Sequence, residues 1–253
     1  MKNFLALIIT AAVAACAFYL FWLPWVPELK TYNPSRTALM DLRKAQARKK
    51  GKELQESMVW RDLGEISPNL REAVLLAEDD VFYIHHGFDP EQIKIALKMN
   101  WEKKRYAYGG STITQQLART LYLTPHKHLL RKIKEAILTA WIEQALGKNR
   151  ILEIYLNVVE WGDGIYGAEA AARRYYQKGA GDLSARESVA LASVLPSPRK
   201  WSPLKETAFM KRRRENILSR MRKPEEKLPP QAKEKQAEEL TNEIPKSAEN
   251  EGP

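Results

Sequence analysis

The sequence has a single cysteine, Cys16, among its 253 residues. One cysteine cannot form an intrachain disulfide and cannot supply a Cys-rich zinc module. Glycine and proline are also scarce, at 12 and 14 residues, which excludes a collagen-like or low-complexity chain. Hydrophobic residues make up 44% of the chain, a share that excludes a fully disordered protein and suffices for one sizeable domain.

Charge is unevenly distributed along the chain. Lys and Arg number 41 against 31 Asp and Glu, a net charge of +10, which points to nucleic acid, a membrane surface or a phosphorylated substrate as an anionic partner. Residues 224–253 hold eight Glu, four Lys and five Pro, so they are net −4 and leave +14 on the rest. Their composition predicts a disordered acidic, Pro-rich tail.

The N-terminus has no charged residue between Lys2 and Glu28, and residues 4–23 are mainly apolar. At about 1.5 Å per residue, a helix of this length spans a hydrocarbon core of about 30 Å. We therefore predict a transmembrane anchor within residues 1–27. A cleaved signal peptide or a lipoprotein signal at Cys16 is the alternative, but the apolar run continues through Trp22.

The segment after the anchor, residues 28–59, is basic and is predicted to be a juxtamembrane helical segment. More positive charge follows the anchor than precedes it, so the positive-inside rule alone would place the following domain in the cytoplasm.

Residues 60–223 are predicted to form an all-α, or nearly all-α, domain. Ser67 followed by Pro68 marks one helix start, and Asn149 and Ser184 are candidate caps for later helices. Helical spacing predicts two apolar stripes, Leu70, Ala73, Val74 and Ala77 in one helix and Ile133, Ile137, Trp141 and Ala145 in another. No six residues alternate between apolar and polar, and we expect no hairpin.

Glu78 lies near the C-terminal end of the first of these helices. Partial burial, the negative end of the helix dipole, and neighbouring Asp79 and Asp80 all disfavour its ionised form. A carboxylate in this position can exchange a proton near neutral pH. The alternative is an acidic helix end exposed to water. His85 and His86 follow, but without a zinc-ligand spacing they are interpreted as loop histidines.

The next polar segment is Gly-Gly-Ser-Thr-Ile-Thr-Gln-Gln, residues 109–116. Ser111 or Thr112 can cap the helix that follows, and a helix N-terminus with hydroxyls favours phosphate groups. Gln115, Gln116 and Arg119 extend the polar run. An ordinary capped helix with a polar exposed face is the alternative.

Arg131, Lys132 and Glu135 share one helix face. Two cations and a carboxylate on one face could hold a pyrophosphate beside a catalytic acid. A surface salt bridge is the alternative, and it would contribute little stability.

Together these segments resemble the peptidoglycan glycosyltransferase family, the lysozyme-like domain of class A penicillin-binding proteins. The resemblance rests on five ordered motifs: EDDVFYIHHG, GGSTITQQ, RKIKE, KNRILEIYLN and GIYGAEAAARRYY. It covers about residues 60–203, and with no transpeptidase domain behind them the chain is similar to the monofunctional form. After Tyr176 the family usually continues Phe-Gly-Lys, whereas this chain reads Gln-Lys-Gly.

The resemblance implies polymerisation of lipid II into β-1,4-linked glycan by inverting transfer from a polyprenyl-pyrophosphate-linked donor to an acceptor GlcNAc 4-hydroxyl. It makes Glu78 the general base and Glu135 the second catalytic glutamate, which orients the pyrophosphate-side groups or a metal. The remaining residues would bind the donor: Ser111, Thr112, Gln115, Gln116, Arg119, Arg131 and Lys132. No cofactor is certain, and a divalent metal ion (Mg or Mn) at the pyrophosphate stays open.

The resemblance also implies a location on the outer face of the cytoplasmic (inner) membrane, against the charge rule. Expected partners are lipid II, the nascent glycan strand, the membrane, and division or elongation proteins, with no nucleic acid. The rival enzyme is a lysozyme-like hydrolase or lytic transglycosylase. A non-enzymatic nucleic-acid binder would use the basic residues 211–223, which we interpret instead as a terminal helix near anionic lipid headgroups.

Overall fold

The computed structural model describes residues 22–103, 109–124 and 129–221, together with part of residues 4–19. The predicted tail, residues 224–253, lies outside the described residues, and so does much of the predicted anchor. Within the described part, no helix is both long enough and apolar enough to cross a membrane.

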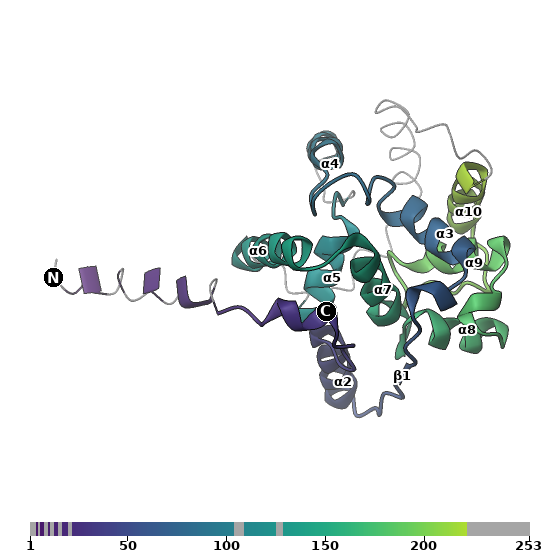
Figure 1. The fold of residues 1–253 in the computed structure, drawn as a ribbon, viewed down its shortest axis with the longest axis horizontal. Coiled ribbons are helices and arrows are strands. Elements are labelled where there is room, and N and C mark those ends of the chain that lie inside the picture. The colour runs from purple at the N-terminus through teal and green to yellow at the C-terminus, as the bar shows by residue number, and fades with distance from the viewer. Residues whose placement is uncertain are drawn as a thin grey trace.

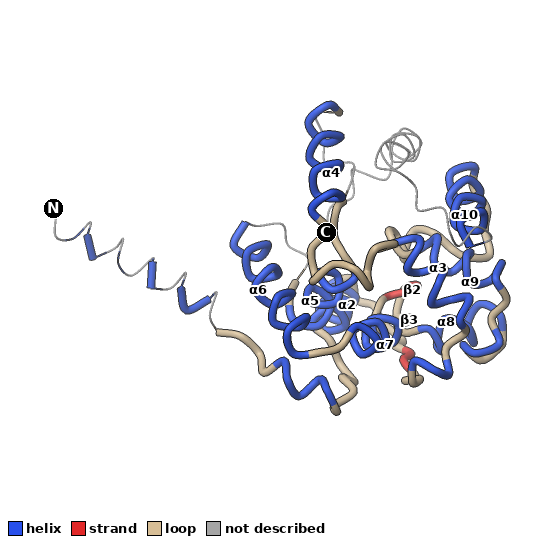
Figure 2. The backbone as a smooth tube through the Cα atoms, turned by 45° about the horizontal axis from the view of Figure 1, so that its top comes forward, coloured by secondary structure: helices blue, strands red, loops and turns tan. Residues whose placement is uncertain are grey.

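Helices dominate the described residues, which confirms the predicted mostly helical fold (Figures 1 and 2). They are η1 (Val26–Lys30), α2 (Ala38–Lys49), η2 (Leu63–Glu65), α3 (Pro68–Glu78), α4 (Pro90–Glu102), α5 (Ile113–Tyr122), α6 (Leu129–Ala145), α7 (Lys148–Val158), α8 (Ala168–Tyr176), η3 (Ala180–Asp182), α9 (Ala185–Val194) and α10 (Ala208–Met221).

The helices pack in two groups that share the main hydrophobic core. Helices α3, α9 and α10 contact one another, while α5 packs against α2, α6 and α7. In Figure 1 the first group lies on the side away from the N-terminal segment, and α5 and α6 lie nearer to it. The C-terminal end of α3 is therefore available to meet side chains from both groups.

A small three-stranded sheet shows that the expectation of no hairpin was wrong. Strands β1 (Ser57–Met58), β2 (Glu160–Gly162) and β3 (Ile165–Tyr166) are ordered β1-β3-β2, with β1 parallel and β2 antiparallel to β3. Asp163-Gly164 makes the turn, and Gly164 has φ +73°, where an added Cβ would collide with the carbonyl oxygen of Gln55. Strands of two or three residues are too short to show alternation.

Local capping signals located most of the predicted helix starts. Helix α3 begins at Pro68 after Ser67, although the Ser67 hydroxyl donates to the Leu183 carbonyl instead of capping. Ser184 caps α9 in a capping box with Glu187. The cap predicted at Asn149 was wrong, because α7 begins one residue earlier, at Lys148.

Helix α6 buries a different face from the one predicted. Ile133 in the predicted stripe is 40% exposed, and the buried residues are Glu135, Leu138, Thr139 and Ile142. Trp141 of the predicted stripe packs edge-on against Trp25, which precedes η1. Trp141 and Ala145 of the predicted stripe are thus only partly buried against the core, and the buried face carries a carboxylate toward the interior.

The N-terminal segment is fixed to the domain through its backbone carbonyls. Lys134 Nζ donates to the carbonyls of Tyr19 (2.7 Å) and Trp22 (2.9 Å). Arg150 donates to the carbonyls of Leu29 and Tyr32, 2.8 Å each. Helices α6 and α7 therefore hold both the end of the predicted anchor segment and the residues just after it.

Glu169 of α8 is a buried structural carboxylate. Its side chain is 1% exposed and accepts hydrogen bonds from Arg61 Nη2 (3.0 Å), Arg173 Nε (2.7 Å) and the Ala180 N–H (2.8 Å). Burial by itself would raise the pKa of this carboxyl, but the donors from Arg61, Ala180 and Arg173 outweigh it and lower the pKa to about 2.

This low pKa predicts an acid-sensitive contribution to stability. The contribution is complete above the unfolded-state pKa of about 4.3. It is lost as the pH falls toward the folded-state pKa of about 2. Chemical denaturation of Glu169→Gln at pH 7 should show a free energy of unfolding lower by about 3 kcal/mol, the equivalent of the pKa difference, because a neutral amide replaces the buried carboxylate that accepts these three hydrogen bonds. Glu91→Gln, an exposed control, should be nearly neutral, and equal losses would contradict the assignment.

Candidate active site

Glu78, the last residue of α3, is held by one donor from each helix group. Its side chain is only 11% exposed. Oε2 accepts from Gln116 Nε2 of α5 at 3.0 Å, and Oε1 accepts from Arg213 Nη2 of α10 at 2.9 Å. The alternative of an acidic helix end exposed to water was wrong.

The pKa of Glu78 is raised, in the direction that the sequence predicted. Burial is the largest cause, because it removes water from the charged form. The charge of Arg213, the hydrogen bond from Gln116 and the charge of Arg119 oppose burial and favour the ionised carboxylate, while Asp79 adds a smaller unfavourable charge. Glu78 is thus a carboxylate of increased basicity with donors arranged for its ionised form.

Asp79, next to Glu78, connects the end of α3 to the start of α5. Its carboxylate accepts from the Ile113 N–H at 2.9 Å and contacts His85 Nε2 at 2.9 Å. The other ring nitrogen of His85 accepts from the Gly87 N–H at 3.0 Å, which assigns the Nε2–H tautomer. His85 is therefore a loop histidine with a structural role, as predicted.

The N-terminus of α5 is occupied by groups of the protein itself. Thr112 is the N-cap, its hydroxyl accepts from the Gln115 N–H, and its own N–H donates to Gln115 Oε1. Both side chains are buried, at 3% and 4% exposure. With the Ile113 N–H bound to Asp79, these amides do not face a phosphate. Thr112 and Gln115 thus orient α5, and Ser111 contributes its carbonyl, which accepts from Gln116 Nε2 at 3.4 Å.

A second charged cluster surrounds Glu135, whose side chain is fully buried. Oε1 contacts Lys132 Nζ at 2.5 Å, Oε2 contacts Arg131 Nη1 at 2.6 Å, and Arg119 Nη1 lies 3.9 Å from Oε2. The surface salt bridge considered for this face was therefore wrong. The side chains of Lys132 and Arg119 are 47% and 35% exposed, so both can also meet an anion from outside.

The surroundings of Glu135 disfavour a divalent ion, because both of its carboxylate oxygens face cations. Across the described ranges, no group of three or more His, Cys, Asp and Glu side chains is placed to hold a metal.

Arg213 is the residue that the sequence analysis missed. It belongs to the basic stretch that we assigned to lipid headgroups, and it lies 135 residues from its partner Glu78. Arg220 of the same helix pairs with Asp80 at 2.8 Å, and Arg214 donates to the carbonyls of Pro203 and Lys205. Three arginines of this stretch are thus used within the domain. The basic composition of residues 211–223 was the only signal in the sequence, and it did not indicate which carboxylate Arg213 would contact.

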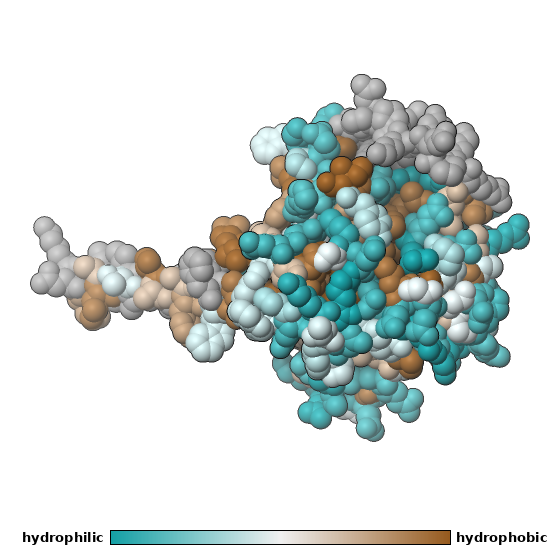
Figure 3. All heavy atoms as spheres, viewed as in Figure 1, coloured by the Kyte–Doolittle hydropathy of each residue, from teal (hydrophilic) through white to brown (hydrophobic). Residues whose placement is uncertain are grey.

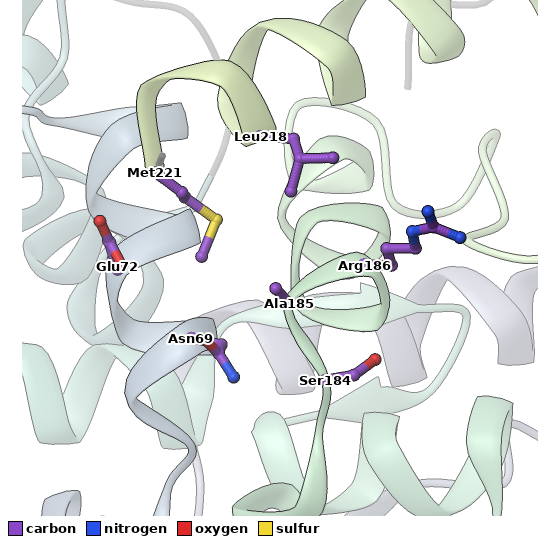
Figure 4. Close-up of a pocket in the computed structure, with 7 residues that line it drawn as sticks. All are labelled: Asn69, Glu72, Ser184, Ala185, Arg186, Leu218 and Met221. Carbon is purple, nitrogen blue, oxygen red and sulfur yellow. The ribbon is translucent and has the colours of Figure 1, made fainter. Parts of the chain in front are cut away.

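A cavity of 390 Å³ lies away from these side chains, at the opposite end of α3 (Figure 4). It is lined by Asn69, Glu72, Ser184, Ala185, Arg186, Leu218 and Met221. None of the predicted site residues lines it.

A buried carboxylate of raised pKa beside a cluster of cations, in a mostly helical domain, fits an enzyme of the glycosyltransferase class. The sequence profile of the Transglycosylase family matches residues 44–222, so the chain belongs to this family.

Similar proteins of named bacteria agree with this assignment. A protein of Azoarcus sp. (strain BH72) is 47% identical over 195 residues, 76% of this chain and 84% of its own length. One of Dechloromonas aromatica (strain RCB) is 41% identical over 222 residues, 87% of this chain and 96% of its own length. Both are named biosynthetic peptidoglycan transglycosylase.

The pairing of Arg213 with Glu78 predicts a shifted titration. In protein labelled with ¹³C-glutamate, the Glu78 carboxyl signal should titrate at higher pH in Arg213→Gln than in the wild type, because the cation that favours the carboxylate is lost. Lys211→Gln removes the same charge from an exposed position of α10 and should leave the midpoint in place. An unchanged midpoint in Arg213→Gln would exclude the pairing in solution.

Proposed function

We propose that the chain polymerises lipid II into β-1,4-linked glycan strands of peptidoglycan. The observation that carries the proposal is the placement of buried Glu78 on α3 near Arg119, which also approaches the Glu135 cluster. Arg119 thus lies between the proposed proton acceptor, Glu78, and the cations that surround Glu135. The names of the similar proteins and the family membership support peptidoglycan as the product.

Glu78 would act on the acceptor sugar. The 4-hydroxyl oxygen of the acceptor GlcNAc attacks the anomeric carbon of the donor MurNAc while the Glu78 carboxylate removes the hydroxyl proton. Its raised pKa makes Glu78 a stronger base than an exposed glutamate, and Gln116 and Arg213 favour the ionised form that this step needs.

The cationic cluster would act on the leaving group. As the new bond forms, the bond between the anomeric carbon and the pyrophosphate oxygen breaks, and its electron pair leaves with the polyprenyl pyrophosphate. Direct displacement inverts the α-linked donor to a β-1,4 product. Arg119 and Lys132, both partly exposed, would stabilise the developing negative charge, and buried Glu135 would hold Lys132 and Arg131 in place.

The proposal does not require a metal held by protein ligands. Since both oxygens of Glu135 contact cations, the charge on the leaving group is assigned to arginine and lysine side chains.

We also propose that the domain works at the outer face of the cytoplasmic membrane, where lipid II and division or elongation proteins would meet it. Large apolar side chains are exposed on α4 and at the start of α6, among them Leu97 (65%), Trp101 (86%) and Leu129 (77%). Brown, hydrophobic residues also gather along the N-terminal segment and at its junction with the domain, whereas most of this face is teal (Figure 3). These surfaces are suited to a lipid-linked substrate.

The decisive experiment is Glu78→Gln, assayed for polymerisation of labelled lipid II. We expect activity to fall by about 10²–10⁴-fold with an unchanged circular dichroism spectrum, because the amide cannot accept the proton. Glu72→Gln removes a carboxylate from the same helix, away from this site, and should retain activity. Substantial polymerisation by Glu78→Gln would show that Glu78 is not the general base.

The product identifies the reaction. Release of muropeptides from finished sacculi, without polymer from lipid II, would support the lysozyme-like hydrolase or lytic transglycosylase and overturn the proposal.

Glu135→Gln tests the leaving-group side. We expect kcat to fall by about 10²–10³-fold because Lys132 and Arg131 lose the charge that positions them. The acid limb of the pH–rate profile should not move, since it belongs to Glu78. A shifted acid limb with a preserved kcat would contradict this division of roles.

A further inference from the structure

Tyr155 of α7 is a buried titratable residue that the proposed mechanism does not use. Its side chain is fully buried, and its hydroxyl donates to Gln116 Oε1 at 3.0 Å. Burial raises the pKa of Tyr155 well above its ordinary value, so the hydroxyl keeps its proton and remains a donor at any working pH.

The amide of Gln116 has two ends with opposite roles. When nitrogen faces Glu78, the amide donates to the carboxylate and favours its ionised form. When the amide is flipped, its oxygen faces Glu78 and favours the protonated form instead.

Two neighbours select the first orientation. The Ser111 carbonyl can only accept, and it lies 3.4 Å from Gln116 Nε2, so it disfavours an oxygen at that place. The Tyr155 hydroxyl donates to Oε1 at the other end of the same amide. The hydroxyl can also accept, so it is the Ser111 carbonyl that disfavours the flipped amide, while the hydroxyl stabilises the amide with its nitrogen toward Glu78 by donating to Oε1.

We infer that Tyr155 is a positioning residue, which acts through Gln116 to hold the general base in its ionised form. The inference rests on the proposed role of Glu78 and adds a connection from α7 to α3 through α5. It assigns Tyr155 no contact with substrate.

Other charged groups around Glu78 come from each neighbouring element. Asp79 lies beside it at the end of α3, Arg119 on α5 and Arg213 on α10. Arg213 and Arg119 favour the ionised carboxylate independently of the amide, so loss of the Tyr155 hydroxyl should weaken the base and not abolish it.

Tyr155→Phe in the full-length chain tests the inference, because it removes one hydroxyl and little volume. The Gln116 carbonyl would lose its donor, so only the Ser111 carbonyl and Glu78 would favour this orientation and the flipped amide would be populated more often. We expect the acid limb of the kcat/KM profile to move to higher pH, with kcat/KM on that limb lower by roughly threefold to tenfold, the range of one hydrogen bond. At high pH, where Glu78 is ionised in both proteins, the difference should disappear.

A matched control separates positioning from loss of packing. Tyr175→Phe also removes a hydroxyl with a carbonyl partner, here Trp161 at 3.2 Å, and should leave the acid limb in place. In a Gln116→Ala background, Tyr155→Phe should cause no further shift of the acid limb, because the amide that links Tyr155 to Glu78 is already absent. A shift of the same size in that background, or none in the wild-type background, would overturn the inference.

Direct titration distinguishes this inference from the proposed function. The ¹³C carboxyl signal of Glu78, assigned by its disappearance in Glu78→Gln, should titrate at higher pH in Tyr155→Phe whether or not the protein polymerises lipid II. If Tyr155→Phe does not fold, 3-fluorotyrosine at this position provides a stronger donor and should move the midpoint to lower pH. An unmoved midpoint in the folded variant would refute the role of Tyr155 even if Glu78 proves to be the base.

Discussion

The ionised carboxylate of Glu78 is the constraint on which the site depends. Burial opposes this charge, so the domain must supply donors where water cannot. They come from α5 and α10, and α7 orients one of them through Tyr155. Four helices therefore have to meet at one side chain, and the packing of α3 against α10 and of α5 against α7 brings them there.

The second glutamate illustrates the opposite use of burial. Glu135 is fully buried and contacts Lys132 and Arg131 directly, so its negative charge holds these two cations in place. Glu78 has fewer charged contacts and keeps a raised pKa, which leaves it able to accept a proton. Arg119 influences both carboxylates. Two residues of the same type thus acquire different chemistry from the number of cations around them.

Local signals in the sequence predicted much of the helical framework. Pro68 and Ser184 marked real helix starts because capping depends on a few neighbouring residues. Arg131 and Glu135 did pair at i,i+4, since helical spacing alone brings them together. The prediction of which face of α6 is buried was wrong, because the packing of neighbouring helices decides which residues of a helix meet the core. The two hairpin strands were missed because each is shorter than a detectable alternation and because the turn pair Asp163-Gly164, a hairpin signal, was overlooked.

The sequence by itself determined the family, the mostly helical class and the candidate glutamates, because motifs, caps and spacings are properties of short segments. Only the tertiary structure decided what surrounds Glu78, and only it brought Arg119 to Glu135. Arg213 lies 135 residues from Glu78, and Gln116 lies 38 residues away, so no local pattern could connect them. Burial and partner charges set the pKa of a carboxylate, and both arise only when distant helices pack.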